Sequence, residues 1–201
     1  MRTAIFGGSF DPVHIGHLLI AESARAAFSL DRIIFMPANI SPHKYAEGNG
    51  ERASASISAE ARCALLRAAL QDNPYFEIST HELERGGVSY TIDTLLAFGA
   101  REDAPVYCLI GADLAPRLGE WHRPQELARL ARFIAVTREG KVPEAPPPFS
   151  LERFDSPGID VSSTMIRERI ASGRSVRYLV PDAVEALIRE RGYYGAGGER
   201  G

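Results

Sequence analysis

TAIFGGSFDPVHIGH, residues 3–17, is the stretch from which the fold of this chain can first be read. A short apolar run leads into two glycines and a turn-forming Asp-Pro pair, after which apolar residues recur at helical spacing. We therefore predict a strand, a tight turn and a helix. The start of such a helix carries backbone N–H groups without intrahelical partners, and these groups favour an anion.

His14 and His17 stand at the predicted start of this helix. Three residues apart, their side chains can face the same way, and each can offer a donor to a phosphate oxygen. An H-x-x-H pair can also be half of a metal site, or two solvated side chains. Tetrahedral zinc would need further ligands nearby, and Asp11 is the one carboxylate in this stretch. Phosphate binding is therefore the favoured interpretation, and no metal ligand is assigned.

The composition is that of an ordinary globular protein. The chain has 201 residues, of which 45% are hydrophobic and 24% charged, so we expect one domain over residues 1–195 and a disordered tail over 196–201. The net charge of −3 and the pI of about 6.0 give no general basic field, so we expect small-molecule ligands and no nucleic acid.

The sequence also predicts a cytoplasmic protein. No run of 18 apolar residues occurs and no secretory leader is evident, so we expect no membrane association. The two cysteines, Cys63 and Cys108, fall in a predicted helix and a predicted strand, which fits two buried thiols in a reducing compartment. The oligomeric state, monomer or homodimer, stays open.

Apolar runs along the chain predict a parallel sheet. Residues 32–37 follow the first helix as a second apolar run, which makes a βαβ unit, and ligands are expected at the carboxyl ends of its strands. We predict an α/β, doubly wound, Rossmann-like fold with a small C-terminal helical part over about 162–191. The further predicted strands are 76–79, 106–110, 133–136 and 151–154, and the further helices are about 58–70, 89–98, 126–131 and 181–191.

Two connections carry candidate ligand-binding residues. The long polar loop 38–57 begins with His43 and Lys44 soon after a strand end, where a cation can reach an anionic substrate. Gly111 follows the most apolar strand and would let a flat ring approach the backbone, while Asp113 is either a helix cap or a carboxylate facing a ligand.

Two later segments could complete a site. The hydroxyls of Ser89 and Thr91 are good helix caps, and the helix start there again exposes N–H donors. Trp121, on a polar connecting segment, could cap the core or stack on a ligand ring.

Residues 160–167, DVSSTMIR, form the second candidate phosphate site. Three hydroxyl residues open a helix, one of them as its cap, and Arg167 lies four residues after Ser163 on the same face. Hydroxyls, N–H groups and a guanidinium would then converge, which suits the outer phosphates of a nucleotide. A capped surface helix with an exposed arginine has comparable weight in isolation.

GSFDPVHIGH resembles the signature of the HxGH nucleotidyltransferases. Further segments make the chain similar to the bacterial nicotinate-nucleotide adenylyltransferase family: PANISPHK, SYTIDTL, LIGADL with Trp121 eight residues after Asp113, VSSTMIR, and VRYLVPDAVEALI. These segments occur in the expected order over nearly the whole chain.

The resemblance implies that ATP and nicotinate mononucleotide are the substrates. It makes His14, His17 and Arg167 the catalytic residues, with Mg²⁺ bound mainly through the ATP phosphates. The implied ATP-binding residues are Gly7, Gly8, Ser9, Phe10, His14, His17, Gly111, Asp113, Ser162, Ser163, Thr164 and Arg167. The implied residues for nicotinate mononucleotide are His43, Lys44, Thr91, Trp121 and His122.

Two alternatives remain at this point. The same core could serve another acceptor, nicotinamide mononucleotide or a pantetheine phosphate. It could also belong to a nucleotide-binding sensor that has lost the chemistry.

Overall fold

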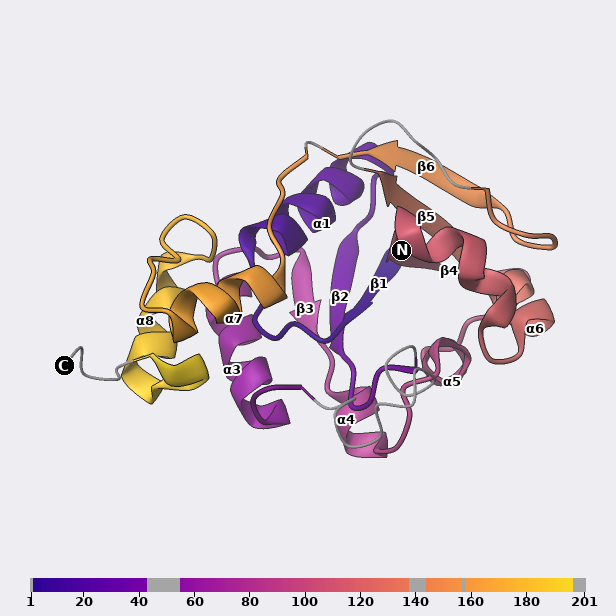
Figure 1. Cartoon of the computed structure of the whole chain (residues 1–201). Coiled ribbons are helices and arrows are strands. Elements are labelled where there is room, and N and C mark those ends of the chain that lie inside the picture. The colour runs from indigo at the N-terminus through magenta and orange to yellow at the C-terminus, as the bar shows by residue number, and fades with distance from the viewer. Residues whose placement is uncertain (1, 43–54, 138–143, 157, 197–201) are drawn as a thin grey trace.

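The computed structural model describes residues 2–42, 55–137, 144–156 and 158–196. Its centre is a six-stranded sheet in which every strand pairs parallel with its neighbour, in the order β3-β2-β1-β4-β5-β6 (Figure 1). The strands are β1 (Thr3–Gly8), β2 (Arg32–Pro37), β3 (Phe76–Ile78), β4 (Val106–Gly111), β5 (Ala131–Thr137) and β6 (Leu151–Asp155).

Helices cover both faces of this sheet because successive strand residues point to opposite sides. In β1, Ala4 and Phe6 join one buried cluster and Ile5 joins the other. The first cluster lies under α1 (Ile15–Ala27), α3 (Ala59–Leu70), α7 (Ser163–Ala171) and α8 (Asp182–Arg191). The second lies under α5 (Thr91–Ala97), the 3₁₀ helix η2 (Ala112–Glu120) and α6 (Pro124–Leu130). Figure 1 shows the first group to the left of the sheet and α5 and α6 to the right.

The strand order reverses between β1 and β4. The chain proceeds from β1 outward through β2 to β3, and then returns to place β4 on the other side of β1. Connections leave these two adjacent strands in opposite directions, which opens a crevice beyond their carboxyl ends. Gly8 ends β1 and Gly111 ends β4, so both glycines lie at this crevice.

The predicted doubly wound parallel sheet is confirmed, and three short helices were not foreseen. They are α4 (His81–Arg85), η2 and η3 (Tyr193–Gly195). The helix α4 is too short to show a helical apolar period, and η2 contains Pro116, which reads as a helix breaker. In addition, α6 begins at Pro124 instead of about residue 126, and Ala131 already belongs to β5.

The structure also bears on the expected C-terminal tail, the two cysteines and the question of a membrane span. Ala196, the first residue of the expected tail, packs against the core, and residues 197–201 lie outside the described part of the chain. Both cysteines are buried free thiols, as predicted. None of the helices in the described ranges is long and apolar enough to cross a bilayer.

Candidate functional site

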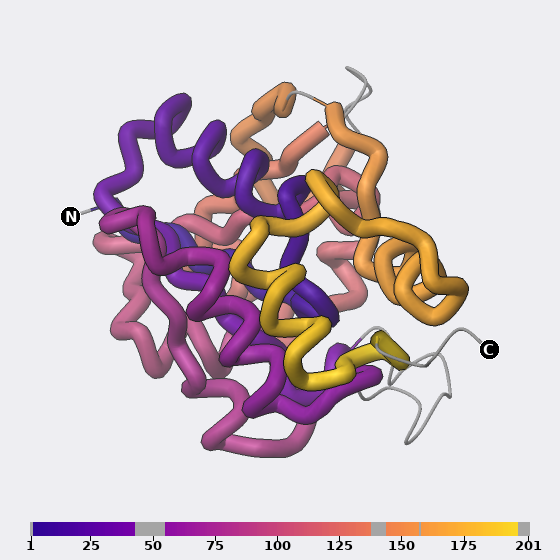
Figure 2. Tube along the Cα trace, turned by 90° about the vertical axis from the view of Figure 1, so that its left-hand side faces the viewer, coloured from indigo at the N-terminus to yellow at the C-terminus, as the bar shows by residue number. Residues whose placement is uncertain are grey.

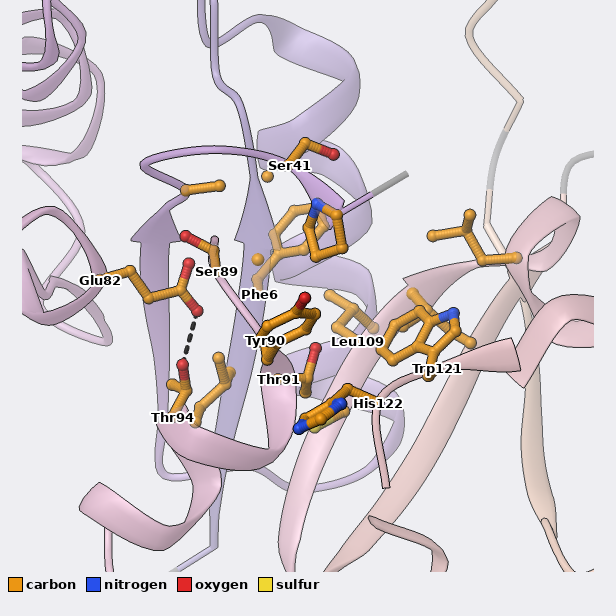
Figure 3. A pocket seen from close by; sticks show the side chains of 18 of the residues that line it. Phe6, Ser41, Glu82, Ser89, Tyr90, Thr91, Thr94, Leu109, Trp121 and His122 are labelled. Carbon is orange, nitrogen blue, oxygen red and sulfur yellow. Dashed lines mark hydrogen bonds between the residues drawn. The ribbon is translucent and has the colours of Figure 1, made fainter. Parts of the chain in front are cut away.

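A cavity of about 520 Å³ lies at the crevice between β1 and β4. It brings together segments far apart in the sequence: the end of β1, the end of β4, the start of α5 and the turn after η2. Figure 3 shows Trp121 toward one end of this cavity, Glu82 and Ser89 toward the other, and Tyr90 between them. Of the predicted site residues, those that line it are Gly7, Gly8, Ser9, Thr91, Gly111, Trp121 and His122.

The turn after β1 is held by an aromatic side chain that points inward. Phe10 has a left-handed φ of 46°, and its ring is 1% exposed. The ring packs against Phe6 and Phe35, with centroids 5.6 and 5.5 Å away. A left-handed non-glycine residue costs on the order of 1–3 kcal/mol, which its burial offsets here. Because the Phe10 ring lies in the core, contact between Phe10 and a nucleotide would have to use the backbone.

His14 and His17 form one unit at the start of α1. His14 is the N-cap residue, and its backbone N–H donates to Nδ1 of His17 at 3.2 Å. The two rings stack with centroids 3.6 Å apart. Since Nδ1 of His17 accepts a hydrogen bond, the proton of the neutral ring resides on Nε2, which makes that nitrogen a donor.

Gly16 leaves the space that the His14 ring occupies. A Cβ atom on Gly16 would lie 3.0 Å from Nδ1 and 3.1 Å from Cε1 of that ring. These separations are shorter than an ordinary van der Waals contact, so a side chain here would displace the ring. The glycine of the His-x-Gly-His stretch therefore fixes where His14 can lie.

The start of α7 is bonded directly to the turn that precedes α1. One of the three hydroxyl residues is predicted to cap this helix, and the structure shows that it is Ser162, whose hydroxyl accepts from the backbone N–H of Met165 at 3.2 Å. The Ser163 hydroxyl donates to the carbonyl oxygen of Pro12 at 2.8 Å. The Arg167 guanidinium donates to the carbonyl oxygen of Asp11 at 2.8 Å.

The two stretches singled out in the sequence are thus neighbours in space. Arg167 also donates to the Thr164 hydroxyl at 3.1 Å. Its side chain is 27% exposed, so part of the guanidinium faces solvent beside the turn.

The end of the cavity near Trp121 is framed by aromatic rings. Trp121 packs edge-on against the core residue Phe133 at 6.0 Å between centroids, and its indole also lines the cavity. The Tyr90 ring lies 4.4 Å from the His122 ring at an interplanar angle of 31°. Capping the core and lining a ligand site, the two interpretations of Trp121, are therefore compatible.

The hydroxyl residues before α5 do not cap that helix as expected. Its N-cap is Tyr90, without a side-chain cap, and Thr91 is already the first helical residue. The buried Ser89 hydroxyl instead accepts from the backbone N–H of Asn39 at 2.9 Å. This bond ties the residues after β2 to the start of α5, which a reading of local sequence could not reveal.

Gly111 and Asp113 lie together at the end of β4. A Cβ atom on Gly111 would collide with the Asp113 carboxylate, so a side chain at residue 111 would displace that carboxylate. Asp113 is an exposed residue within η2, and the N-cap of η2 is Gly111. The helix-cap interpretation of Asp113 is therefore wrong.

Two buried charged residues of the site were missed. Arg62 in α3 is 2% exposed and donates to the carbonyl oxygens of Ser9 and Ala38, at 2.8 and 2.9 Å. Burial lowers the pKa of the Arg62 guanidinium, an effect that the negative charge of Asp11 opposes. Arg62 falls on the apolar stripe of its helix, three and four residues before two buried leucines, which is a signal that could have revealed it.

Glu82 is the other missed residue. It is 6% exposed, lines the cavity and accepts from the Thr94 hydroxyl at 2.6 Å (Figure 3). It belongs to the unforeseen helix α4, so no local pattern of residues places it near the site.

His43 and Lys44 lie outside the described residues. Within the described ranges, no group of three or more His, Cys, Asp or Glu side chains is arranged to hold a metal ion. Most of the predicted residues that can be placed form two adjoining parts: the cavity, and the cluster of His14, His17, Ser163, Thr164 and Arg167 around the Asp11-Pro12 turn. Phe10 and Asp113 do not line the cavity.

Known proteins resemble the chain over nearly its full length. The cytidylyltransferase-like family model matches residues 5–169. A probable nicotinate-nucleotide adenylyltransferase of Exiguobacterium sibiricum is 44% identical over 96% of this chain and 99% of its own length. One from Geobacillus thermodenitrificans is 42% identical over 97% of this chain and 87% of its own length.

A solved structure supports the fold independently. The Plasmodium falciparum nicotinic acid mononucleotide adenylyltransferase, complexed with NaAD, superposes with a TM-score of 0.76 at 17% identity, covering 98% of this chain and 99% of that one. The family model and the full-length similarity to these relatives agree. The chain belongs to the nicotinate-nucleotide adenylyltransferase family, within the cytidylyltransferase-like proteins.

Proposed function

We infer that this chain transfers the adenylyl group of ATP to nicotinate mononucleotide, giving nicotinate adenine dinucleotide and pyrophosphate, a step of NAD biosynthesis. The observation that carries this inference is the cavity at the β1/β4 crevice, which runs from the glycines that end β1 to the indole of Trp121. The relatives named as nicotinate-nucleotide adenylyltransferases point to the same reaction.

The reaction needs no protein nucleophile. The 5′-phosphate of the mononucleotide attacks the α-phosphorus of ATP in line, the bond from that phosphorus to the bridging oxygen breaks, and pyrophosphate leaves with the electron pair. The protein then has to position the reactants and stabilise the charge on the phosphates. His17, whose Nε2 is the donor, and His14 beside it serve the α-phosphate.

The ATP side is built from backbone as much as from side chains. Gly7, Gly8 and Ser9 line the cavity with little side-chain bulk, which allows a close approach of phosphates to the backbone, and Phe10 takes part through its backbone. Gly111 and Asp113 line the adenosine. The outer phosphates are held by Ser162, Ser163, Thr164 and Arg167.

The acceptor side uses aromatic stacking and backbone donors. The pyridine ring stacks on Trp121, and backbone N–H groups at Thr91 and His122 receive its carboxylate. His43 and Lys44 meet the phosphate of the mononucleotide. An amide in place of the carboxylate would leave these donors poorly paired, so nicotinamide mononucleotide is the poorer substrate.

A divalent cation, Mg²⁺, fits this site as a partner of the nucleotide. The described residues offer single carboxylates and not a cluster, which suits an ion that is held by ATP phosphates and keeps most of its water. When bound, Mg²⁺ neutralises charge on the phosphate oxygens.

The cytoplasm, with its reducing environment, is the compartment that suits the free thiols of Cys63 and Cys108.

Pyrophosphate release tests this function. Purified protein with ATP and Mg²⁺ is given nicotinate mononucleotide, nicotinamide mononucleotide or pantetheine phosphate in separate reactions. We expect kcat/KM to be highest for nicotinate mononucleotide, by at least about 10-fold, with nicotinate adenine dinucleotide identified by mass spectrometry. A preference for either other acceptor would change the substrate assignment, and no release with any acceptor would favour a non-catalytic sensor.

A further inference from the structure

The carboxylate of Asp11 is a junction between four segments of the chain. It is 3% exposed, in the turn between β1 and α1. Tyr194 of η3 donates its hydroxyl to Oδ1 at 2.9 Å, and the backbone N–H of Ser56 donates to Oδ2 at 2.6 Å. Arg167 of α7 lies on the third side and buried Arg62 of α3 contributes positive charge nearby. Figure 2 shows the yellow segment around η3 near the purple segment that precedes α3, which agrees with these bonds.

Such a carboxylate needs explanation in a site for phosphates. A buried negative charge repels phosphate oxygens and attracts the nearest cation, and the cation in question is Arg167. In the structure Arg167 does not form a direct hydrogen bond with the Asp11 carboxylate. The Arg167 guanidinium donates to the backbone carbonyl of Asp11 at 2.8 Å, whereas its Nη1 stays 3.9 Å from the carboxylate oxygen Oδ2.

The two carboxylate oxygens already have donors of their own. Tyr194 serves Oδ1 and the Ser56 N–H serves Oδ2, so the carboxylate is satisfied without a direct hydrogen bond from Arg167. Burial, together with the neighbouring Asp11 charge, raises the pKa of the Tyr194 phenol. The phenol therefore keeps its proton and remains a donor at neutral pH.

We propose that Tyr194 and Asp11 are positioning residues that keep Arg167 available to the substrate phosphates. Tyr194 occupies the carboxylate, and Arg167 is then held at the turn by the Asp11 carbonyl and the Thr164 hydroxyl instead of pairing with the carboxylate. Since Tyr194 lies in η3, which packs against α7, the C-terminal segment becomes part of the phosphate site without touching substrate. The proposal rests on the proposed function in one respect, that Arg167 binds ATP phosphates.

The test is Tyr194→Phe, with Tyr193→Phe as the matched control. Tyr194→Phe removes one hydroxyl and leaves Oδ1 of Asp11 without its phenol donor, so Arg167 turns toward the carboxylate. We expect kcat to fall about 10-fold while KM for nicotinate mononucleotide changes less than 2-fold. Tyr193→Phe, which loses the same atom one residue earlier, is expected to retain wild-type kcat.

A double-mutant cycle separates positioning from a merely structural role. In an Arg167→Ala background, Tyr194→Phe should change kcat by less than 2-fold, because the residue through which it acts is gone. ATP affinity, measured by calorimetry on the same four proteins, should show the same coupling. Equal losses in both backgrounds would overturn the proposal, as would unchanged kcat and ATP affinity in Tyr194→Phe. If the wild-type protein binds ATP but forms no product, the proposed function fails and the calorimetric coupling still decides this proposal.

Discussion

His17 has one observed role in this structure and one proposed role, and substitutions can separate them. Its Nδ1 accepts the His14 backbone N–H at 3.2 Å, which caps α1, and its Nε2 is the proposed donor to phosphate. His17→Asn keeps an acceptor near the position of Nδ1 and removes the Nε2 donor. His17→Ala removes both atoms. The pair therefore distinguishes the cap from the phosphate donor.

The expected magnitudes follow from these roles. Loss of one preorganised donor to a transition-state oxyanion costs about 10²–10³-fold in kcat, so both variants should lose activity to that extent. Loss of the cap costs about 1 kcal/mol in the free energy of unfolding, which for a protein of this size lowers Tm by about 2–4 °C. We expect that shift in His17→Ala and a smaller one in His17→Asn.

Steady-state pyrophosphate release and differential scanning calorimetry measure the two effects. The decisive protein is His17→Asn, because its fold should be close to that of the wild type. A kcat within about 3-fold of wild type in His17→Asn would refute the donor role of Nε2. Equal Tm losses in the two variants would refute the capping role of Nδ1.

Three further changes have distinct expected outcomes. Gly16→Ala should lower kcat about 10-fold by displacing the His14 ring, while Tm stays equal or rises because alanine favours helix. A fall in both kcat and Tm would contradict this expectation. Ser89→Ala should lower the free energy of unfolding, measured in urea, by about 1–3 kcal/mol, because the Asn39 N–H loses its acceptor. KM for the mononucleotide should rise as α5 shifts. An unchanged urea midpoint would argue against this role of the Ser89 hydroxyl. Burial raises the pKa of Cys108 to about 12, so the folded state keeps a proton that the unfolded state loses above about pH 9. The free energy of unfolding should therefore fall between pH 9 and 12, by up to ~1.4 kcal/mol per pH unit. The variant Cys108→Val should lack this part of the pH dependence.

The sheet could be predicted because its information is local. The strands β1 and β4 contain continuous apolar runs that end in glycine, and such runs are typical of strands buried on both faces of a parallel sheet. The short helices α4 and η2 carry no comparable local signal. With α4 the carboxylate of Glu82 was missed as well, although it lines the cavity.

The histidines and the α7 hydroxyls could be singled out as candidates because their spacing is chemically specific. How they are joined could not be found, since Arg167 bonds to a residue 156 positions earlier and Tyr194 to one 183 positions earlier. Patterns among neighbouring residues in the sequence give no information about such long-range contacts. The cap expected from Ser89 failed for the same reason, because its partner Asn39 belongs to the segment after β2.

Trp121 is the single tryptophan of the chain, which allows the most direct test of where the acceptor binds. Because the pyridine ring is proposed to stack on this indole, titration with nicotinate mononucleotide should quench the intrinsic fluorescence saturably, at concentrations near the KM of the turnover assay. Nicotinamide mononucleotide should need at least about 10-fold higher concentration for the same quench. Saturable turnover with no change in Trp121 fluorescence would place the acceptor elsewhere and contradict the site described above.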